Sequence, residues 1–135
     1  MDSQALAGSR IVGFGHYQPE RVMTNDDLAQ IVDTSDEWIR TRTGIRTRHI
    51  GSESDTVTSM AIEAGRCALE RSGIDPSEVD QVIVASTSLT DRAPYTAGRV
   101  AVALGMGTPA PLDINTACSG FESALALADL SLIHI

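Results

Sequence analysis

The sequence contains no lysine, and all ten of its basic residues are arginines. Eighteen acidic residues outnumber them, so the formal net charge is -8. Such a charge argues against non-specific binding to nucleic acid, because the phosphate backbone attracts basic surfaces. The chain also lacks an apolar run near the ~20 residues that a membrane-spanning helix needs, so we expect no membrane span.

Cysteine is also scarce, with two residues in the chain, and no secretory signal pattern opens the sequence. These features indicate a reducing, cytoplasmic location. Low-complexity segments, internal repeats and linkers are absent, which excludes a disordered chain or a repeat array. The 135 residues, 42% of them hydrophobic, are enough for one core, so residues 1–135 are expected to form a single unit.

Apolar periodicity and turn residues predict strands alternating with helices, which is typical of an α/β fold with a mixed, largely parallel sheet and helices on both faces. The predicted strands are 10–17, 45–50, 82–85 and 111–114. The predicted helices, caps included, are 24–32, 33–44, 55–73, 96–104 and 121–135, with a short helix start at 75–78. The last helix carries an apolar stripe without a cap, so the chain is expected to be truncated.

The stretch 111–121, with the sequence PLDINTACSGF, places Cys118 at a turn from a strand to a helix. Unsatisfied N–H groups at a helix start favour a thiolate, and small neighbours let a carbonyl group approach the sulfur. Two interpretations stay open from spacing alone: a nucleophile, or a small buried hydrophobic residue. Cys67 lies in the middle of a predicted helix, where a packing role is expected.

Three sequence runs resemble β-ketoacyl-acyl-carrier-protein synthase III, a condensing enzyme of the thiolase-like superfamily. They are TSDEWI at 34–39, TRTGI at 41–45 and NTACSGF at 115–121. The resemblance extends from about Arg10 to Asp129, in order and at the family's spacing. It implies two duplicated α/β halves, of which this chain is the N-terminal one, and a homodimer at full length.

The resemblance also implies a reaction and its substrates. Cys118 would take an acyl group from acyl-CoA, and malonyl-acyl carrier protein would then condense with that thioester to begin fatty-acid synthesis. Trp38 matches the family's tryptophan on the CoA adenine, Arg42 the arginine on its other face, and Thr34 a threonine near the same nucleotide. Neither a cofactor nor a metal is expected.

Without the resemblance, Trp38 is interpreted as a half-buried core aromatic. The remaining arginines of this stretch are interpreted as a solvated edge or, alternatively, as an attraction for CoA phosphates or the acidic carrier protein: Arg40, Arg46 and Arg48. Neither His16 nor His49 matches a catalytic histidine of the family, and both are expected to be structural or exposed. His134 lies in a tail that does not match the family.

Several features depart from the family. Its catalytic histidine and asparagine lie in the second half, so the chain alone is expected to be inactive in condensation. Residues 130–135 fit the expected continuation poorly and are predicted to be a non-native tail. Ala93 replaces a phenylalanine of many relatives, which favours a branched or longer primer. Two alternatives remain: a starter enzyme of polyketide or secondary metabolism, and a non-catalytic fragment that binds CoA or carrier protein.

Overall fold

The computed structural model describes residues 9–89 and 95–134, so Ala93 lies outside the described residues. The secondary-structure elements, in chain order, are β1 (Val22–Thr24), α1 (Asn25–Ala29), α2 (Asp36–Thr43), β2 (Thr47–His49), α3 (Val57–Ser72), η1 (Pro76–Glu78), β3 (Gln81–Ala85), α4 (Thr96–Ala103), β4 (Ala110–Ile114), η2 (Ala117–Ser119) and α5 (Gly120–His134). η1 and η2 are single 3₁₀ turns.

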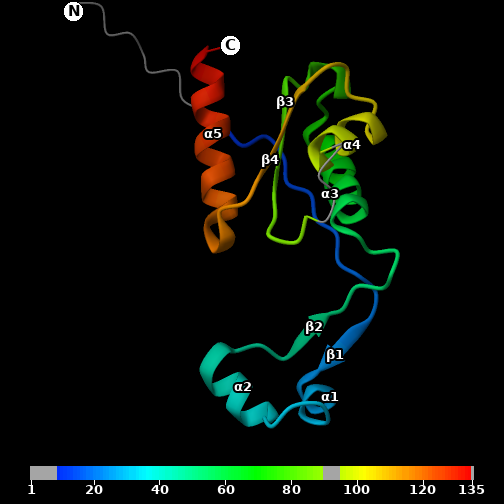
Figure 1. Ribbon diagram of the computed structural model, residues 1–135, viewed down its shortest axis with the longest axis vertical. Coiled ribbons are helices and arrows are strands. Elements are labelled where there is room, and N and C mark those ends of the chain that lie inside the picture. The colour runs from blue at the N-terminus through cyan, green and yellow to red at the C-terminus, as the bar shows by residue number, and fades with distance from the viewer. Residues whose placement is uncertain (1–8, 90–94, 135) are drawn as a thin grey trace, which may run out of the picture.

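The elements form two lobes that lie end to end (Figure 1). The small lobe, residues 20–50, contains β1, α1, α2 and β2, which pack on one another. The large lobe, residues 56–89 and 95–134, contains α3, β3, α4, β4 and α5. Residues 9–19 and 51–55 lead from one lobe to the other. The α2 sequence run and the cysteine run therefore lie in different lobes.

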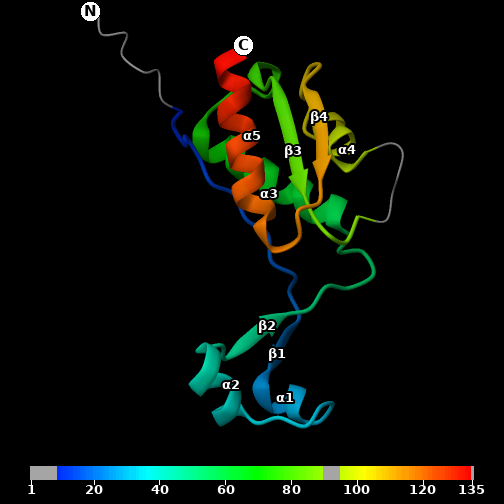
Figure 2. The same ribbon diagram turned by 60° about the vertical axis from the view of Figure 1, so that its left-hand side comes forward.

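Three layers make up the large lobe. β3 and β4 pair in parallel, from Gln81 opposite Ala110 to Ala85 opposite Ile114. α5 packs on one face of this pair, while α4 packs on the other face with α3 beside it (Figures 1 and 2). The most buried apolar side chains of this lobe come from α4 and its end: Ala97, Val100, Ala101 and Leu104. The predicted parallel pairing and the helices on both faces are confirmed here.

The strand predicted at 10–17 is wrong, because the structure has no strand in that segment. Residues 13–15 pack directly on the backbone of α3 instead. A Cβ atom added to Gly15 would overlap the carbonyl oxygen of Ala64 and would lie 2.5 Å from the nitrogen of Ala68. A strand needs a hydrogen-bonded neighbour, and a helix surface cannot provide one. Gly13 and Gly15 thus allow this segment to approach the backbone of α3 closely.

The small lobe contains a strand that the sequence did not indicate. β1 pairs with β2 in antiparallel register, with Val22 opposite His49. The helix predicted to reach Val32 ends at Ala29, and the side chains of Ile31 and Val32 are 68% and 50% exposed. A longer helix would therefore bury little apolar surface, which is the main source of helix stability in proteins.

Helix ends agree well with the predicted caps. Ser35 accepts a hydrogen bond from the N–H of Trp38 at the start of α2, and Gly44 ends this helix with a φ of 73°. Thr56 begins α3 with a capping box, and Gly73 ends it with a φ of 69°. Glycine suits both ends because it has no Cβ to clash in the left-handed conformation.

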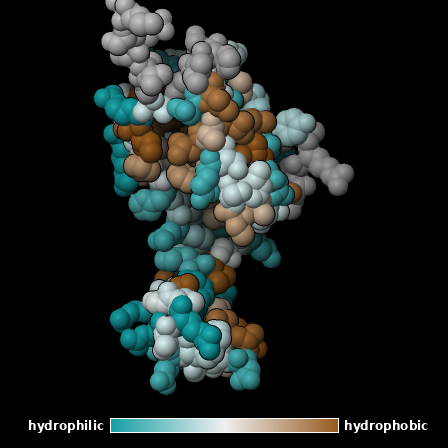
Figure 3. All heavy atoms as spheres, turned by 90° about the vertical axis from the view of Figure 1, so that its left-hand side faces the viewer, coloured by the Kyte–Doolittle hydropathy of each residue, from teal (hydrophilic) through white to brown (hydrophobic). Residues whose placement is uncertain are grey.

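α5 leaves apolar side chains exposed on more than one side. Figure 3 looks onto the face of the large lobe that carries α5 and shows hydrophobic atoms beside hydrophilic ones. The exposed α5 side chains are Phe121, Leu125, Leu127 and Leu130. α5 includes residues 130–134, whose predicted non-native origin stays a prediction. In the ranges 9–89 and 95–134, no helix is both long and apolar enough to cross a bilayer.

Candidate functional site

Cys118 lies in the turn that joins β4 to α5. Its residue is exposed, its thiol is free, and it occupies the single 3₁₀ turn η2 directly before the first residue of α5. The predicted strand-to-helix turn is confirmed. The alternative interpretation of Cys118 as a small buried residue is wrong, because the turn lifts it out of the core. An exposed thiol at the start of a helix is available to a substrate.

Backbone geometry on both sides fixes this turn. Ala117 has a φ of 50°, and it is the one described residue other than glycine with a positive φ. Its N–H donates to Oδ1 of Asn115 at 3.2 Å. Gly120 lies so close to β3 that a Cβ there would be 3.2 Å from the Cβ of Ala85. Strained residues persist where their surroundings hold them, and such positions are common at functional sites.

The turn follows the carboxyl end of the parallel pair. Ser86 donates its N–H to the carbonyl of Ile114 at 3.1 Å, so β3 and β4 end at the same edge. Ligands of open parallel sheets bind outside this edge. A cavity of about 610 Å³ lies beyond it. Its lining comes from the starts of α3 and α4 and from the exit of β3: Asp55, Thr56, Val57, Thr58, Ser59, Ile62, Ser88, Leu89, Thr96 and Arg99.

Trp38 and Arg42 form a stacked pair on α2. They are four residues apart on the helix, and the Cζ atom of Arg42 lies 4.7 Å from the centroid of the indole. Trp38 is 54% exposed, so its interpretation as a half-buried core aromatic is wrong. Thr34 precedes the cap residue Ser35 and is half-buried. An exposed indole beside a guanidinium suits a planar ligand with negative charge.

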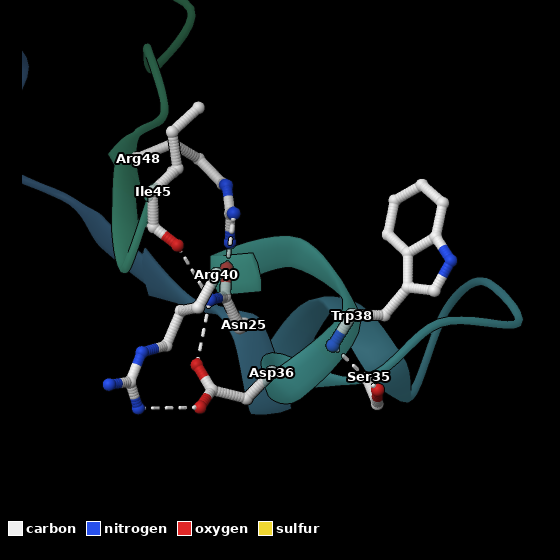
Figure 4. A network of polar contacts seen from close by, with 7 residues as sticks. All are labelled: Asn25, Ser35, Asp36, Trp38, Arg40, Ile45 and Arg48. Carbon is white, nitrogen blue, oxygen red and sulfur yellow. Dashed lines mark hydrogen bonds and ion pairs between the residues drawn. The ribbon is translucent and has the colours of Figure 1, made fainter. Parts of the chain in front are cut away.

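A buried asparagine, Asn25, contacts both ends of α2, and the sequence did not indicate this role. Asn25 is 1% exposed. Its Nδ2 donates to Oδ1 of Asp36 at 2.8 Å and to the carbonyl of Ile45 at 2.9 Å, while Nη2 of Arg48 donates to its Oδ1 at 2.5 Å. Figure 4 shows these bonds converging on one side chain. In the sequence, Asn25 is one of the polar residues after Thr24, and these residues indicated only the start of a helix.

These hydrogen bonds also favour the ionised form of Asp36. The pKa of this carboxyl is lowered chiefly by the hydrogen bond from Asn25, and then by the hydrogen bond and charge of Arg40 and the charge of Arg46. Desolvation of the carboxyl acts in the opposite direction. Asp36 is the first residue of α2, where negative charge also interacts well with the helix dipole. The start of α2 is therefore a fixed, charged point of the small lobe.

The three other arginines of this stretch differ in their roles. Nη1 of Arg48 donates to the carbonyl of Thr24 at 2.9 Å. The guanidinium of Arg48 therefore forms hydrogen bonds inside the small lobe, and it is neither a solvated edge nor a phosphate ligand. Arg40 pairs with Asp36 at 3.2 Å, and its side chain is 47% exposed. Arg46 is exposed. Arg40 and Arg46 line a hollow of about 420 Å³ beside α2.

The histidine predictions can be checked for two of the three residues. His16 is exposed, and Nδ1 of the exposed His49 lies 2.5 Å from the carbonyl oxygen of Pro19. The side chain of His134 lies outside the described part of the structure. Among the described residues, no group of three His, Cys, Asp or Glu side chains is placed to hold a metal ion.

The structure brings the predicted residues together in two groups. Thr34, Trp38 and Arg42 belong to the small lobe, and Cys118 belongs to the large lobe. In Figures 1 and 2 the first turn of α5, beside Cys118, is the end of that helix nearer to the small lobe. The arrangement supplies an exposed thiol and, in the other lobe, an exposed aromatic and cationic surface.

Curated proteins similar to this chain share one name. The sequence is 52% identical over 124 residues to β-ketoacyl-[acyl-carrier-protein] synthase III 2 of Streptomyces avermitilis. The matched residues cover 92% of this chain and 39% of that protein. It is 54% identical over 122 residues to synthase III 4 of Streptomyces coelicolor, covering 90% and 39%. The chain thus spans about two-fifths of these relatives. No protein-family model matches the sequence.

Solved structures give the same likeness. 3-oxoacyl-[acyl-carrier-protein] synthase III from Aquifex aeolicus superposes with a TM-score of 0.89 at 45% identity, over 94% of this chain and 41% of that chain. The priming β-ketosynthase of the R1128 polyketide biosynthetic pathway gives a TM-score of 0.85 at 38% identity, over 89% and 36%. The two-lobed arrangement therefore occurs in solved proteins.

Proposed function

We propose that this chain, which belongs to the β-ketoacyl-[acyl-carrier-protein] synthase III family, carries the acyl-accepting cysteine of a condensing enzyme. Its fold is that of the thiolase-like N-terminal portion of the family. The observation that supports this most is the exposed Cys118 at the turn between β4 and α5. Sequence identity near 50% over nine-tenths of the chain gives the reaction class.

In the proposed first step, the sulfur of Cys118 attacks the carbonyl carbon of acyl-CoA. The C–S bond to CoA breaks, CoA leaves as its thiolate and takes a proton, and the acyl group stays on Cys118 as a thioester. The backbone N–H of Cys118 serves as one donor to the oxyanion, since small neighbours leave room for the carbonyl.

In the proposed second step, malonyl-acyl carrier protein loses carbon dioxide, and the resulting carbanion attacks the Cys118 thioester. A new C–C bond forms, the thiolate of Cys118 leaves, and β-ketoacyl-carrier protein is released. The groups that stabilise this carbanion belong to the second half of the family's fold, so the present chain does not condense by itself. Acyl-CoA and malonyl-carrier protein are substrates, and neither step requires a cofactor or a metal.

The small lobe is proposed to bind the nucleotide of CoA. The indole of Trp38 stacks with the adenine, and Thr34 lies near the same nucleotide. The guanidinium of Arg42 lies 4.7 Å from the centroid of the indole, which leaves no room for a purine between the two groups, so Arg42 must turn away from the indole to reach the other face of the adenine. The exposed pair on α2 supports this assignment, because a purine is a planar ligand that gains from contact with both groups.

The exposed apolar side chains of α5 are proposed to pack against the second half of the fold, in a cytoplasmic homodimer. Phe121, Leu125 and Leu130 are 67%, 45% and 54% exposed. Large apolar side chains exposed on one helix in this number mark surfaces that another protein surface covers. The second half, which the chain does not span, is the natural occupant.

The test is transfer of an acetyl group from acetyl-CoA to the protein, read by mass spectrometry of the intact chain and of its peptides. We expect one hydroxylamine-labile acetyl group on Cys118 in the protein extended to the length of its relatives. Cys118→Ala should abolish it, and the matched control Cys67→Ala should retain it. Acetylation that persists in Cys118→Ala would contradict the proposal.

A second candidate is a priming enzyme of polyketide synthesis, which the likeness to the R1128 priming β-ketosynthase supports. Ala93 is consistent with a branched or longer primer. Competition among acetyl-, isobutyryl- and hexanoyl-CoA for Cys118 in the extended protein separates the two. A third candidate, a non-catalytic fragment, predicts that CoA binds to the chain by calorimetry without any acyl transfer.

A further inference from the structure

We propose that Asn25 is the positioning residue that sets the orientation of the Trp38–Arg42 pair toward its ligand, an inference that rests on the proposed nucleotide site. Asn25 has the side chain most completely enclosed in the small lobe, with 1% exposure. It is the first residue of α1, whereas Trp38 and Arg42 belong to α2. Asn25 therefore acts on the pair from a different helix, through its hydrogen bond to the first residue of α2.

The carboxamide of Asn25 uses both of its N–H groups and its oxygen in hydrogen bonds. One N–H donates to Asp36 and the other to the carbonyl of Ile45, so the amide ties the first residue of α2 to the segment that follows this helix. Its oxygen accepts from Arg48 of β2. An asparagine has two donors and an acceptor on one plane, and a carboxylate of the same shape has no donor.

The same contacts determine where α2 lies. Asp36 begins α2, Gly44 ends it, and Ile45 is the next residue, so Asn25 contacts both ends of an eight-residue helix. Arg48 adds a bond to the carbonyl of Thr24, which joins the network to β1. Figure 4 shows the indole of Trp38 directed away from this network.

Trp38 has little else to hold it in place. Its residue is 54% exposed, and its backbone N–H is bonded to Ser35 of the same turn. The buried apolar side chain of α2 is Ile39. Because an exposed side chain takes its position from the helix that carries it, loosening the ends of α2 should widen the range of indole positions.

The experiment compares Asn25→Asp with wild type in the 135-residue chain. Asp keeps the shape and the acceptor for Arg48, and removes both donors. The matched control is Arg66→Ala, which removes an exposed 3.5 Å ion pair to Glu63 on α3 of the large lobe and leaves the contacts of Asn25 intact. Time-resolved anisotropy of Trp38, the single tryptophan of the chain, reports its mobility. Calorimetry with adenosine 3′,5′-bisphosphate reports the affinity.

We expect Asn25→Asp to increase the mobility of Trp38 and to weaken the nucleotide affinity by about three- to tenfold, the range expected when one more side chain must be immobilised on binding. Arg66→Ala should change neither. In a Trp38→Ala/Arg42→Ala background, Asn25→Asp should leave the remaining affinity unchanged, because both residues through which it acts are gone. The reciprocal variant Asn25→Asp/Asp36→Asn restores a donor–acceptor pair between the two positions and should recover part of both signals.

Three results would overturn the inference. They are unchanged anisotropy in Asn25→Asp, an equal affinity loss in the Trp38→Ala/Arg42→Ala background, and no recovery in the reciprocal variant. If the small lobe of Asn25→Asp unfolds, the reciprocal variant still tests the inference, because a lack of recovery there also counts against it. If the wild-type chain binds no nucleotide, the proposed nucleotide site fails, and the anisotropy comparison still decides whether Asn25 positions Trp38.

Discussion

The carboxylate of Asp113 accepts a hydrogen bond from the backbone N–H of Thr96, with an O···N distance of 2.7 Å. Its second oxygen accepts from the N–H of Ala97 at 2.8 Å. Asp113 belongs to β4 and the two donors begin α4, where Tyr95 at the N-cap position provides no side-chain cap. The strand that leads to Cys118 thus caps the most buried helix of the large lobe.

Replacing Asp113 by alanine should destabilise the chain by about 1–2 kcal/mol, the usual cost of losing a helix cap. The physical reason is that two N–H groups at the start of α4 lose their acceptors in a buried position, since Thr96 is 2% exposed. Urea unfolding followed by circular dichroism measures the change. The exposed Asp80→Ala is the matched control, and equal midpoints for the two variants would refute the assigned role.

The two cysteines should react at different rates with iodoacetamide. Cys118 is exposed in its turn, whereas Cys67 is half-buried in the middle of α3. Alkylation depends on access of the reagent to the sulfur, so we expect Cys118 to react several-fold faster. Peptide mass spectrometry over time measures both rates in one sample, and Cys118→Ser gives the rate of Cys67 alone. Equal rates would show that the turn is closed in solution.

Gly15 should not tolerate alanine. A Cβ there would overlap the carbonyl oxygen of Ala64 and crowd the nitrogen of Ala68, and neither backbone atom can move aside easily. We expect Gly15→Ala to destabilise the chain by about 1–3 kcal/mol, as overpacking usually does.

The control for Gly15→Ala is Gly98→Ala. A Cβ at Gly98 would lie 3.9 Å from the Cβ of Pro111, an ordinary contact inside α4. Alanine is the better helix former, so this variant should keep or raise the unfolding midpoint. If Gly15→Ala unfolded at the wild-type urea concentration, residues 13–15 would not pack on α3 as the structure has them.

The contact between Tyr17 and Asp55 should make stability depend on pH in both directions. The O–H of Tyr17 donates to Oδ1 of Asp55 at 2.6 Å. The pKa of Asp55 is lowered by hydrogen bonds from Ser52 first and from Tyr17 next, and the pKa of Tyr17 is raised chiefly by its hydrogen bond to Asp55. The Asp55 contribution is therefore present above its unfolded pKa near 4 and is lost as the pH falls further.

The Tyr17 contribution has the opposite sign. It is present below its unfolded pKa near 10 and is lost as the pH rises through the higher folded value. Tyr17→Phe should therefore lower the urea midpoint most between pH 5 and pH 9, and the difference from wild type should shrink at pH 3 and at pH 11. The exposed Tyr95→Phe is the control. A difference that stayed constant from pH 3 to pH 11 would contradict this linkage.

Much of the local structure could be predicted because its causes are local. Ser35, Thr56, Gly44 and Gly73 cap helices through hydrogen bonds and backbone angles that neighbouring residues determine. The position of Cys118 after a short apolar strand followed from the same kind of signal. The strand predicted at 10–17 failed because pairing depends on a neighbour, and this segment contacts the backbone of α3 instead.

The sequence by itself determined the α/β alternation, the helix caps, the strand-to-helix turn that contains Cys118 and the family resemblance. All of these depend on residue types at short and fixed spacings. Only the tertiary structure decided that Cys118 and Trp38 are exposed, that Arg48 forms hydrogen bonds inside the small lobe, and that Asn25 joins the two ends of α2. The three hydrogen bonds of Asn25 link residues that are 11 to 23 positions apart, so its partners are known only once the chain has folded.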